Sequence, residues 1–213
     1  KSCKRPMHKK LEDRIRESLP NQSDDELNKI KVFVLRAIEF NKSHNIFVRE
    51  VAEEVFEKDI LDCMPIIEKI NHNEKILDMG SGGGFPGLLI AILRPGCEIH
   101  LLEKSQKKCY FLNKIIHELE LVNTKTLNTH IRPNNKLGTY SLITSRAFSS
   151  TENTLKLSNK NLRTGGRYIL LKGREEKIIE EIQSLDTNKY KCEIIKIENT
   201  KHERHLVEIK INE

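Results

Sequence analysis

The stretch Lys75-Ile-Leu-Asp-Met-Gly-Ser-Gly-Gly-Gly-Phe-Pro-Gly87 decides the fold, because a short apolar run in it leads directly into a glycine-rich loop. The first part, from Lys75 to Met79, has the length and apolar content of a buried strand. The apolar residues after the loop, Leu88 to Leu93, predict a helix. A glycine-rich loop between a strand and a helix is where α/β sheets bind nucleotide-like ligands. The stretch therefore predicts the first unit of an α/β fold with a ligand site.

Strands and helices continue to alternate after this unit, which predicts a doubly wound sheet with helices on both faces. The last two strands have a short connection, which favours an antiparallel pair. We therefore predict an α/β, Rossmann-like sheet that is mostly parallel and ends in an antiparallel C-terminal hairpin. The further strands are predicted at residues 98–102, 124–128, 140–144, 167–171, 190–197 and 205–211, and the helices at residues 105–118, 151–158 and 175–185.

The residues before the first strand have helical spacing and almost no strand signal. Ser23 and Glu26 form a capping-box pattern, and apolar residues then recur at helical spacing from Leu27 to Ile38. A second helical stretch begins at Val51. The sequence thus predicts a helical N-terminal extension over residues 1–68 and a Rossmann-like domain over residues 69–213.

Composition and charge exclude several classes of protein. The 213 residues contain no apolar run of the roughly 18–20 residues that a membrane span needs, and no signal-peptide core follows the basic N-terminus. The five cysteines include no C-x-x-C pair, which argues against a disulfide framework and a thiolate zinc site. We therefore predict a cytoplasmic protein with no membrane contact and no metal ion. The net charge of +6 favours a polyanionic partner.

Two cofactor classes fit the glycine loop. The spacing Gly82-x-Gly84-x-x-Gly87, with Glu103 about twenty residues beyond the loop, matches a dinucleotide fingerprint and predicts a nicotinamide cofactor. The spacing Gly80-x-Gly82-x-Gly84 after Asp78 instead matches the loop of S-adenosylmethionine-dependent methyltransferases.

The charges around the loop favour S-adenosylmethionine. A pyrophosphate is negatively charged and would be repelled by Asp78, whereas the sulfonium and ammonium groups of S-adenosylmethionine suit a carboxylate. Glycines in the loop let the backbone approach the ligand without Cβ atoms. Glu103, at the end of the second strand, is expected to accept hydrogen bonds from the two ribose hydroxyls.

The residues after the fourth strand limit the methyl acceptor. Enzymes that methylate exocyclic amines of bases carry an Asn or Asp followed by Pro-Pro and an aromatic residue there, whereas this chain has Ser145-Arg-Ala-Phe148. No cysteine is adjacent to a proline as carbon-5 pyrimidine chemistry requires, and the lysine and carboxylate set of ribose methylation is missing. These exclusions leave an acceptor that is already nucleophilic, such as guanine N7.

Several motifs together resemble the RsmG family, also called glucose-inhibited division protein B. The resemblance implies a methyltransferase that modifies guanine N7 in the decoding-site loop of 16S ribosomal RNA, with the RNA or the small ribosomal subunit as partner. It extends from about Asn41 to Lys210. The motifs are Leu77-Asp-Met-Gly-Ser-Gly-Gly-Gly-Phe-Pro-Gly87, Leu101-Leu-Glu-Lys-Ser-Gln-Lys-Lys108, Ser145-Arg-Ala-Phe148, Leu171-Lys-Gly173 and Glu203-Arg-His-Leu-Val207.

The resemblance also implies site residues. Its cofactor contacts fall on Gly80, Phe85, Arg146 and the pair Ile131-Arg132, with Arg146 expected to hold the methionyl carboxylate. The chain departs from the family pattern at Arg132, where an acidic residue is usual. It also departs from the pattern at His130 (usually Arg), Asp59 (usually His) and Cys63 (usually Ser).

No residue is assigned as a catalytic acid or base, and the predicted role of the site is positioning. Lys172 and Arg204 are the candidates for contacts with the RNA acceptor. His202 and His205 invite a metal hypothesis, but the sequence shows no third ligand near them. Two alternatives to the methyltransferase stay open: a nicotinamide-dependent oxidoreductase and a non-catalytic RNA-binding assembly factor.

Overall fold

The computed structural model describes residues 5–46, 48–198 and 203–212. The N-terminal third is helical, as predicted, and the capping box is formed: Ser23 Oγ accepts from Glu26 N, and the Glu26 carboxylate accepts from Ser23 N. The second helical stretch is a continuous helix with one wide π turn in its middle. The elements of this part are α1 (Arg5–Ser18), α2 (Asp24–His44), α3 (Ala52–Val55), the π-helix η1 (Phe56–Ile60) and α4 (Leu61–Glu68).

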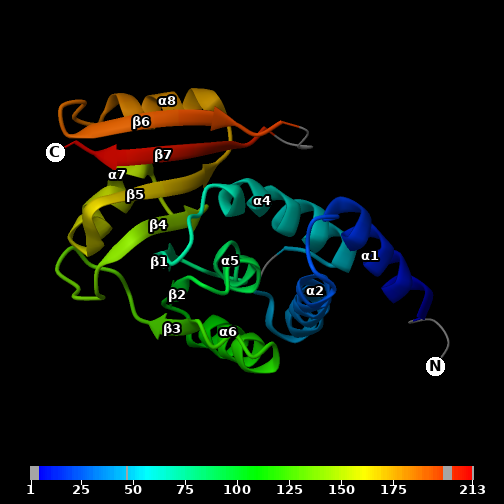
Figure 1. The fold of residues 1–213 in the computed structure, drawn as a ribbon. Helices are drawn as coiled ribbons and strands as arrows, with labels where there is room; N and C mark the ends of the chain where they lie inside the picture. The colour runs from blue at the N-terminus through cyan, green and yellow to red at the C-terminus, as the bar shows by residue number, and fades with distance from the viewer. Residues whose placement is uncertain (1–4, 47, 199–202, 213) are drawn as a thin grey trace.

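The rest of the chain forms one seven-stranded sheet in the order β3-β2-β1-β4-β5-β7-β6 (Figure 1). Strands β1 to β5 pair in parallel, and β7 pairs antiparallel with both β5 and β6, which confirms the predicted fold class. The strands are β1 (Lys75–Met79), β2 (Glu98–Glu103), β3 (Thr124–Asn128), β4 (Tyr140–Arg146), β5 (Leu162–Lys172), β6 (Tyr190–Lys196) and β7 (His205–Ile211). The helices between them are α5 (Gly87–Leu93), α6 (Gln106–Glu118), α7 (Thr151–Ser158), the 3-10 helix η2 (Asn159–Asn161) and α8 (Glu175–Gln183).

Two apolar cores lie on the two faces of the sheet. Alternate residues of each strand point to opposite faces, so Ile76 joins one core and Leu77 the other. The first core holds α5, α6 and the N-terminal helices, and the second holds α7 and α8. The carboxyl ends of β1, β2 and β4 are thereby fixed side by side at one edge of the sheet, where the glycine loop lies.

The N-terminal helices pack directly on the sheet domain. The ring of Phe33 on α2 lies 4.9 Å from that of Phe85 in the glycine loop, and Arg36 Nε donates to Glu118 Oε1 on α6 at 2.7 Å. Both parts share one apolar core, so no gap in the packing separates them at residue 68. The domain boundary predicted there stays a prediction. Within the described residues, no helix is both long enough and apolar enough to cross a membrane.

The largest difference from the predicted boundaries is at the start of β5. The sequence Thr164-Gly165-Gly166 predicts a turn before a strand at Arg167, but β5 already begins at Leu162. The register between β4 and β5 shifts from Tyr140↔Leu162 to Leu142↔Arg167, so the extra residues form an irregularity inside the strand. A glycine with positive φ, such as Gly165 at +70°, is typical of such a bulge.

Candidate functional site

A pocket of about 390 Å³ lies beyond the carboxyl ends of β1, β2 and β4. Its size is in the range of sites for small ligands and cofactors, and its place is where open α/β sheets bind them. The pocket combines apolar walls with a few charged groups. It is lined by Gly80, Leu102, Glu103, Lys104, Lys108, Thr129, His130, Ile131, Ala147, Phe148, Ser149, Asn153 and Leu157.

The first turn of the glycine loop is held against the neighbouring strand. The N–H groups of Gly80 and Ser81 both donate to Leu102 O, at 2.9 and 3.1 Å. Gly80 has φ of +70°, and a Cβ atom added to it would lie 2.5 Å from Cδ2 of Phe148. Backbone conformation and lack of space therefore both require glycine at this position.

Glu103 is buried at the end of β2 and lines the pocket. One carboxylate oxygen, Oε2, accepts from Gly82 N at 3.0 Å, and the other, Oε1, accepts from Ser105 N at 2.8 Å. Each carboxylate oxygen has a second lone pair, so these two bonds orient the group and leave it able to accept from a ligand. The predicted pairing of Glu103 with ribose hydroxyls is compatible with this arrangement.

Asp78 lies beneath the loop and not among the described residues that line the pocket. Its Oδ2 accepts from Gly87 N at 3.1 Å, at the start of α5, whereas Oδ1 is buried and has no hydrogen-bond partner among the described residues. Burial raises the pKa of this carboxyl group to about 7. Asp78 thus fixes the loop to the helix, and its predicted contact with the cofactor stays a prediction.

Replacing Asp78 by asparagine is expected to remove a pH dependence of stability. The folded protein keeps the proton of this carboxyl up to about pH 7, whereas the unfolded chain releases it near pH 3.8. Between these values the folded state binds more protons, so the free energy of unfolding falls as the pH rises, by up to about 4 kcal/mol over the whole window.

Urea unfolding of the wild type and Asp78→Asn between pH 4.5 and 7.5 measures this effect. The stability of the wild type relative to the variant should decrease across the window. Asp13→Asn, at an exposed acid on α1, is the matched control and should show no such trend. A constant difference between the wild type and Asp78→Asn would contradict the raised pKa.

Gly84 and Phe85 face the protein interior, whereas Gly82 is half-buried and is not among the described pocket-lining residues. A Cβ atom on Gly84, which has φ of +95°, would collide with Leu88. Phe85 is 4% exposed and packs on Phe33, so its ring is engaged in the core rather than in the pocket. Of the predicted cofactor contacts in this loop, the structure therefore brings Gly80 to the pocket and uses Gly84 and Phe85 to shape the loop behind it.

Arg146, at the end of β4, points toward the N-terminal helices. Its Nη1 donates to Asp59 Oδ1 at 2.7 Å and to Lys58 O at 3.3 Å, and its guanidinium carbon lies 5.3 Å from the ring centre of Phe85. Asp59 also accepts from Arg49 Nε, at 3.2 Å. The predicted role of Arg146 toward the methionyl carboxylate stays a prediction, because in this structure the guanidinium is bonded to Asp59.

Ile131 and Arg132, the pair after β3, differ in their position relative to the pocket. Ile131 is buried and lines the pocket together with His130, whose Nδ1 lies 2.9 Å from Ile131 O. Arg132 is exposed and is not among the described residues that line the pocket. Of the two cofactor contacts predicted at this pair, the structure therefore brings only Ile131 to the pocket among the described residues, and the contact itself stays a prediction.

The two predicted acceptor-side cations are both in ion pairs. Lys172 Nζ donates to Ser149 O at 2.8 Å and to Glu181 Oε2 at 2.9 Å, and Arg204 Nε donates to Asp62 Oδ2 at 2.9 Å. Neither is among the described pocket-lining residues. Lys172 thus acts on the pocket through Ser149, which lines it, and contact of either residue with RNA stays a prediction.

Sequence reasoning did not single out the wall formed by Phe148, Ser149, Asn153 and Leu157. Phe148 stands in the quoted motif Ser145-Arg-Ala-Phe148, so a signal was present there. The turn that aims Phe148 at Gly80 includes Ala147, which has φ of +53°. A positive φ at alanine has no sequence signature, so this wall required the structure.

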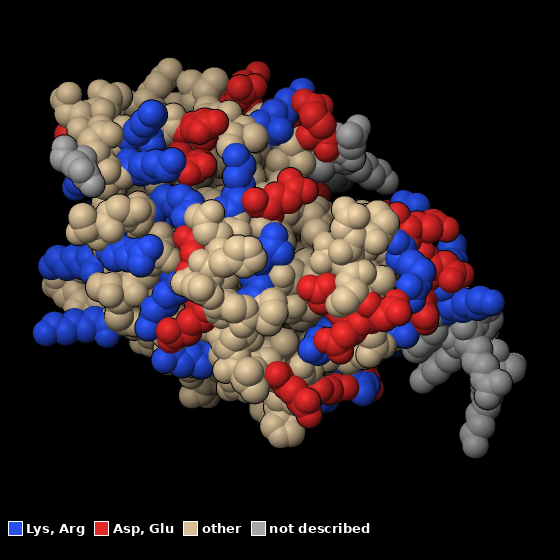
Figure 2. Space-filling model, viewed as in Figure 1, with Lys and Arg blue, Asp and Glu red and all other residues tan. Residues whose placement is uncertain are grey.

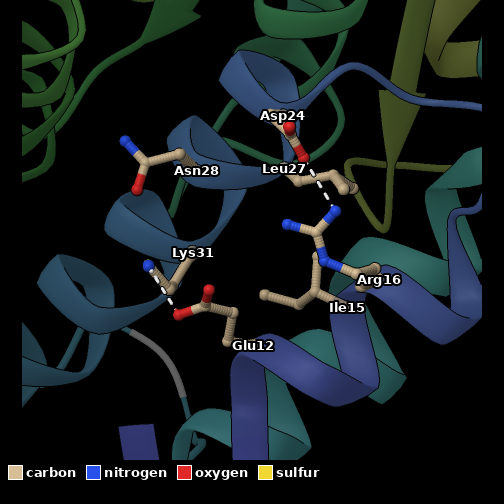
Figure 3. A pocket seen from close by; sticks show the side chains of 7 residues that line it. All are labelled: Glu12, Ile15, Arg16, Asp24, Leu27, Asn28 and Lys31. Atoms are coloured by element: carbon tan, nitrogen blue, oxygen red, sulfur yellow. Dashed lines mark hydrogen bonds and ion pairs between the residues drawn. The ribbon is translucent and has the colours of Figure 1, made fainter. Parts of the chain in front are cut away.

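A second hollow, of about 70 Å³, lies between α1 and α2 (Figure 3). Figure 3 shows two ion pairs across it: Arg16 Nη1 lies 2.7 Å from Asp24 Oδ1, and Lys31 Nζ lies 2.9 Å from Glu12 Oε2. The hollow is too small for a nucleoside, and these charges are already paired within the protein. It therefore joins α1 to α2 and is not a candidate for the cofactor.

Surface charge does not by itself locate a partner. On the face seen in Figure 2, basic and acidic side chains are interspersed, with basic ones prevailing on the left, on the side where Figure 1 shows β4 and β5. The net charge of +6 is therefore not gathered into one patch on this face. The lysines that line the pocket are a more specific indication of where an anion would contact the protein.

Comparisons with known proteins match most of the chain to one family. The model of the GidB family, described as rRNA small subunit methyltransferase G, matches residues 26–207. Ribosomal RNA small subunit methyltransferase G of Brachyspira hyodysenteriae is 34% identical over 188 residues, covering 86% of this chain and 90% of that protein. Ribosomal RNA small subunit methyltransferase G 1 of Bdellovibrio bacteriovorus is 37% identical over 71% of this chain and 72% of that protein.

Solved structures show the same fold at low sequence identity. A ribosomal protein L11 methylase from Lactobacillus delbrueckii subsp. bulgaricus superposes with a TM-score of 0.58 at 15% identity, covering 73% of this chain and 80% of that one. A putative methyltransferase from Streptococcus mutans, solved in complex with SAH, gives a TM-score of 0.53 at 13% identity, over 72% of this chain and 97% of that one. Both confirm the Rossmann-like sheet.

Proposed function

The chain belongs to the rRNA small subunit methyltransferase G family, and we propose that it transfers a methyl group from S-adenosylmethionine to N7 of a guanine in the decoding-site loop of 16S ribosomal RNA. One observation carries the proposal in the structure. Gly80 and Glu103 lie together in a pocket at the carboxyl ends of β1 and β2, with the basic side chains of Lys104 and Lys108 on its wall. The comparisons give no support to a nicotinamide-dependent oxidoreductase or to a non-catalytic assembly factor.

The residues present fit S-adenosylmethionine. Gly80 lines the pocket beside the ring of Phe148 and offers its backbone to a ligand. Glu103 offers carboxylate oxygens to the ribose hydroxyls, and Leu102 and Ile131 provide apolar surface for the adenine. The buried carboxylate of Glu103, on the pocket wall, favours a ligand with positive charge over a pyrophosphate.

The acceptor chemistry needs alignment more than proton transfer. S-adenosylmethionine, when bound, supplies a methyl group on a positively charged sulfur, and guanine N7 has a free lone pair that can attack it. Because no proton has to leave N7 before the attack, the chain must mainly orient the base and exclude water. We place the cofactor against Glu103 and Ile131, and the guanine beside Phe148 and Asn153. Stacking on an aromatic ring is a usual way to hold an unpaired RNA base.

The proposed partner is 16S ribosomal RNA, free or in the small ribosomal subunit, and this partner implies a cytoplasmic location. Lys104 and Lys108 would contact phosphates near the target base. Lys172 holds Ser149, and with it the turn that carries Phe148, so its contribution to RNA methylation would be through positioning.

Mapping of 7-methylguanosine in 16S ribosomal RNA tests the proposal. In cells that lack the protein, we expect one decoding-site methylguanosine to disappear completely, while all other modifications of the RNA remain. The wild-type gene should restore it. In vitro, the purified chain should transfer labelled methyl groups to small subunits or 16S RNA taken from the deficient cells, and not to RNA from wild-type cells, whose site is already modified.

Each other outcome excludes a specific part of the proposal. Methylation at another atom of the guanine would overturn the N7 assignment but retain the enzyme class. Binding of S-adenosylmethionine without transfer to any RNA would instead support the assembly factor. Thermal protection by a nicotinamide cofactor rather than by S-adenosylmethionine would support the oxidoreductase.

A further inference from the structure

Three potential metal ligands meet beside the ends of β5 and β7. Glu175 lies in the first turn of α8, His205 begins β7, and Glu203 precedes β7 by two residues. One ligand atom from each of the three lies within 4.8 Å of the other two. We propose that Glu175, Glu203 and His205 form a binding site for a divalent transition-metal ion of the zinc type.

The imidazole of His205 provides the observation that points to a ligand. The side chain is 1% exposed, and its Nδ1 lies 2.8 Å from Gly173 O. A carbonyl oxygen can only accept, so Nδ1 carries the proton and the neutral ring has its lone pair on Nε2. This Nε2 is buried and has no hydrogen-bond partner among residues 5–46, 48–198 and 203–212. Histidines that bind metals show the same arrangement, with the second ring nitrogen donating to a carbonyl or carboxylate.

The two carboxylates are placed to complete the site. Glu175 Oε2 lies 4.0 Å from His205 Nε2, and Glu203 Oε1 accepts from Glu175 N at 2.9 Å. In a tetrahedral site with bonds of about 2.0–2.1 Å, ligand atoms lie about 3.4 Å apart. Both glutamates are on the surface, so their side chains can make the shift of roughly an ångström that would bring the ligand atoms to this spacing. One water molecule would supply the fourth ligand.

The donor set indicates which ions fit. One imidazole nitrogen and two carboxylate oxygens suit Zn²⁺ and Co²⁺, whereas a magnesium site would use oxygen ligands alone. The two negative charges also balance the charge of a divalent ion. The sequence pairs His205 with His202 and shows no third ligand near them, and His202 lies outside the described residues. The fold supplies that ligand in Glu175, whose backbone N–H is already bonded to Glu203.

A bound ion would connect the first turn of α8 to the two paired segments beside it, the exit of β5 and the start of β7. Lys172 and His205 are direct partners across β5 and β7, and Arg204 beside them holds Asp62 on α4. The ion would therefore stabilise the edge of the sheet that contacts the N-terminal helices. This site is separate from the proposed cofactor pocket, and it does not depend on the methyl transfer.

Calorimetry with Zn²⁺ and visible absorption with Co²⁺, on the full chain without added cofactor, test the proposal. We expect binding of one ion per chain, which the double variant Glu175→Gln with Glu203→Gln weakens at least about tenfold. Both glutamates are exposed, so this variant should fold normally, and circular dichroism checks this. Glu176→Gln removes one negative charge from the same turn of α8 without touching the cluster, and it should bind as the wild type does.

Two results would overturn the site. Equal affinity in the double variant and in Glu176→Gln would show that the cluster does not bind the ion. A Co²⁺ spectrum with the charge-transfer bands of thiolate ligands would place the ion at cysteines instead. His205→Asn should also abolish binding, and His117→Asn, at an exposed histidine on α6, is its control.

Discussion

Replacement of Gly80 by valine is expected to lower the affinity for S-adenosylmethionine at least about 100-fold and to abolish methylation. Gly80 has φ of +70°, a conformation that valine adopts at high cost, and its Cβ position lies 2.5 Å from the ring of Phe148. The ring cannot stay where it is. Because both residues line the pocket, the displaced ring and the new side chain would occupy the space that we assign to the cofactor.

Gly165→Val is a matched control for this variant. Gly165 has the same φ of +70°, but a Cβ atom added there would meet nothing within 4 Å. Both variants therefore carry the same backbone strain, and only the first crowds the pocket. Calorimetric titration with S-adenosylmethionine should give near wild-type affinity for Gly165→Val. Unchanged affinity in a folded Gly80→Val protein would show that the cofactor binds elsewhere.

The parts of the molecule that the sequence predicts well depend on local signals. The strand from Lys75 to Met79, the glycine spacing after it and the acid at Glu103 all follow from residues close together in the chain. The alternation of strands and helices then fixes the sheet, because parallel strands with right-handed connections allow few arrangements. Gly80, Glu103 and Ile131 consequently lie in the pocket where the sequence predicts the cofactor.

The partners of the charged residues could not be predicted in the same way. Arg204 pairs with Asp62 and Arg146 with Asp59, although 142 and 87 positions separate these residues in the chain. Nothing in the local pattern of an arginine after a strand reveals which acid it will meet. The sequence shows Asp59 as a departure from the family pattern. Its role as the ion-pair partner of Arg146 follows only from the fold, in which Asp59 lies in the π turn of η1.

The departure at Asp59 suggests that Arg146 holds the N-terminal helices to the sheet domain. The carboxylate of Asp59 is 5% exposed, and the side chain of Arg146 is 25% exposed. Removing one partner of a buried ion pair costs several kcal/mol, because the remaining charge stays buried. Arg49 still pairs with Asp59, at 3.2 Å, so the loss should be smaller than for a pair with no substitute.

Arg146→Met is therefore expected to lower the free energy of unfolding by about 2 kcal/mol, or about 30-fold in the folding equilibrium. Asp59→Asn removes the buried charge, so the double variant should be destabilised by less than the sum of the two single variants. We expect a coupling free energy of about 1–2 kcal/mol from urea unfolding of the four proteins. A coupling near zero would mean that the ion pair does not connect the two parts.

Cofactor binding by the same four proteins separates the two roles of Arg146. If Arg146 acts through Asp59, its replacement by methionine should change the affinity for S-adenosylmethionine within about threefold, and S-adenosylhomocysteine should follow the same pattern. If Arg146 instead binds the methionyl carboxylate, Arg146→Met should weaken both ligands at least about tenfold, because both carry that carboxylate. Asp59→Asn would then leave the affinity unchanged or raise it, since it frees the guanidinium to bind the ligand. Loss of affinity in Arg146→Met together with a gain in Asp59→Asn would reverse the role that the ion pair assigns to Arg146.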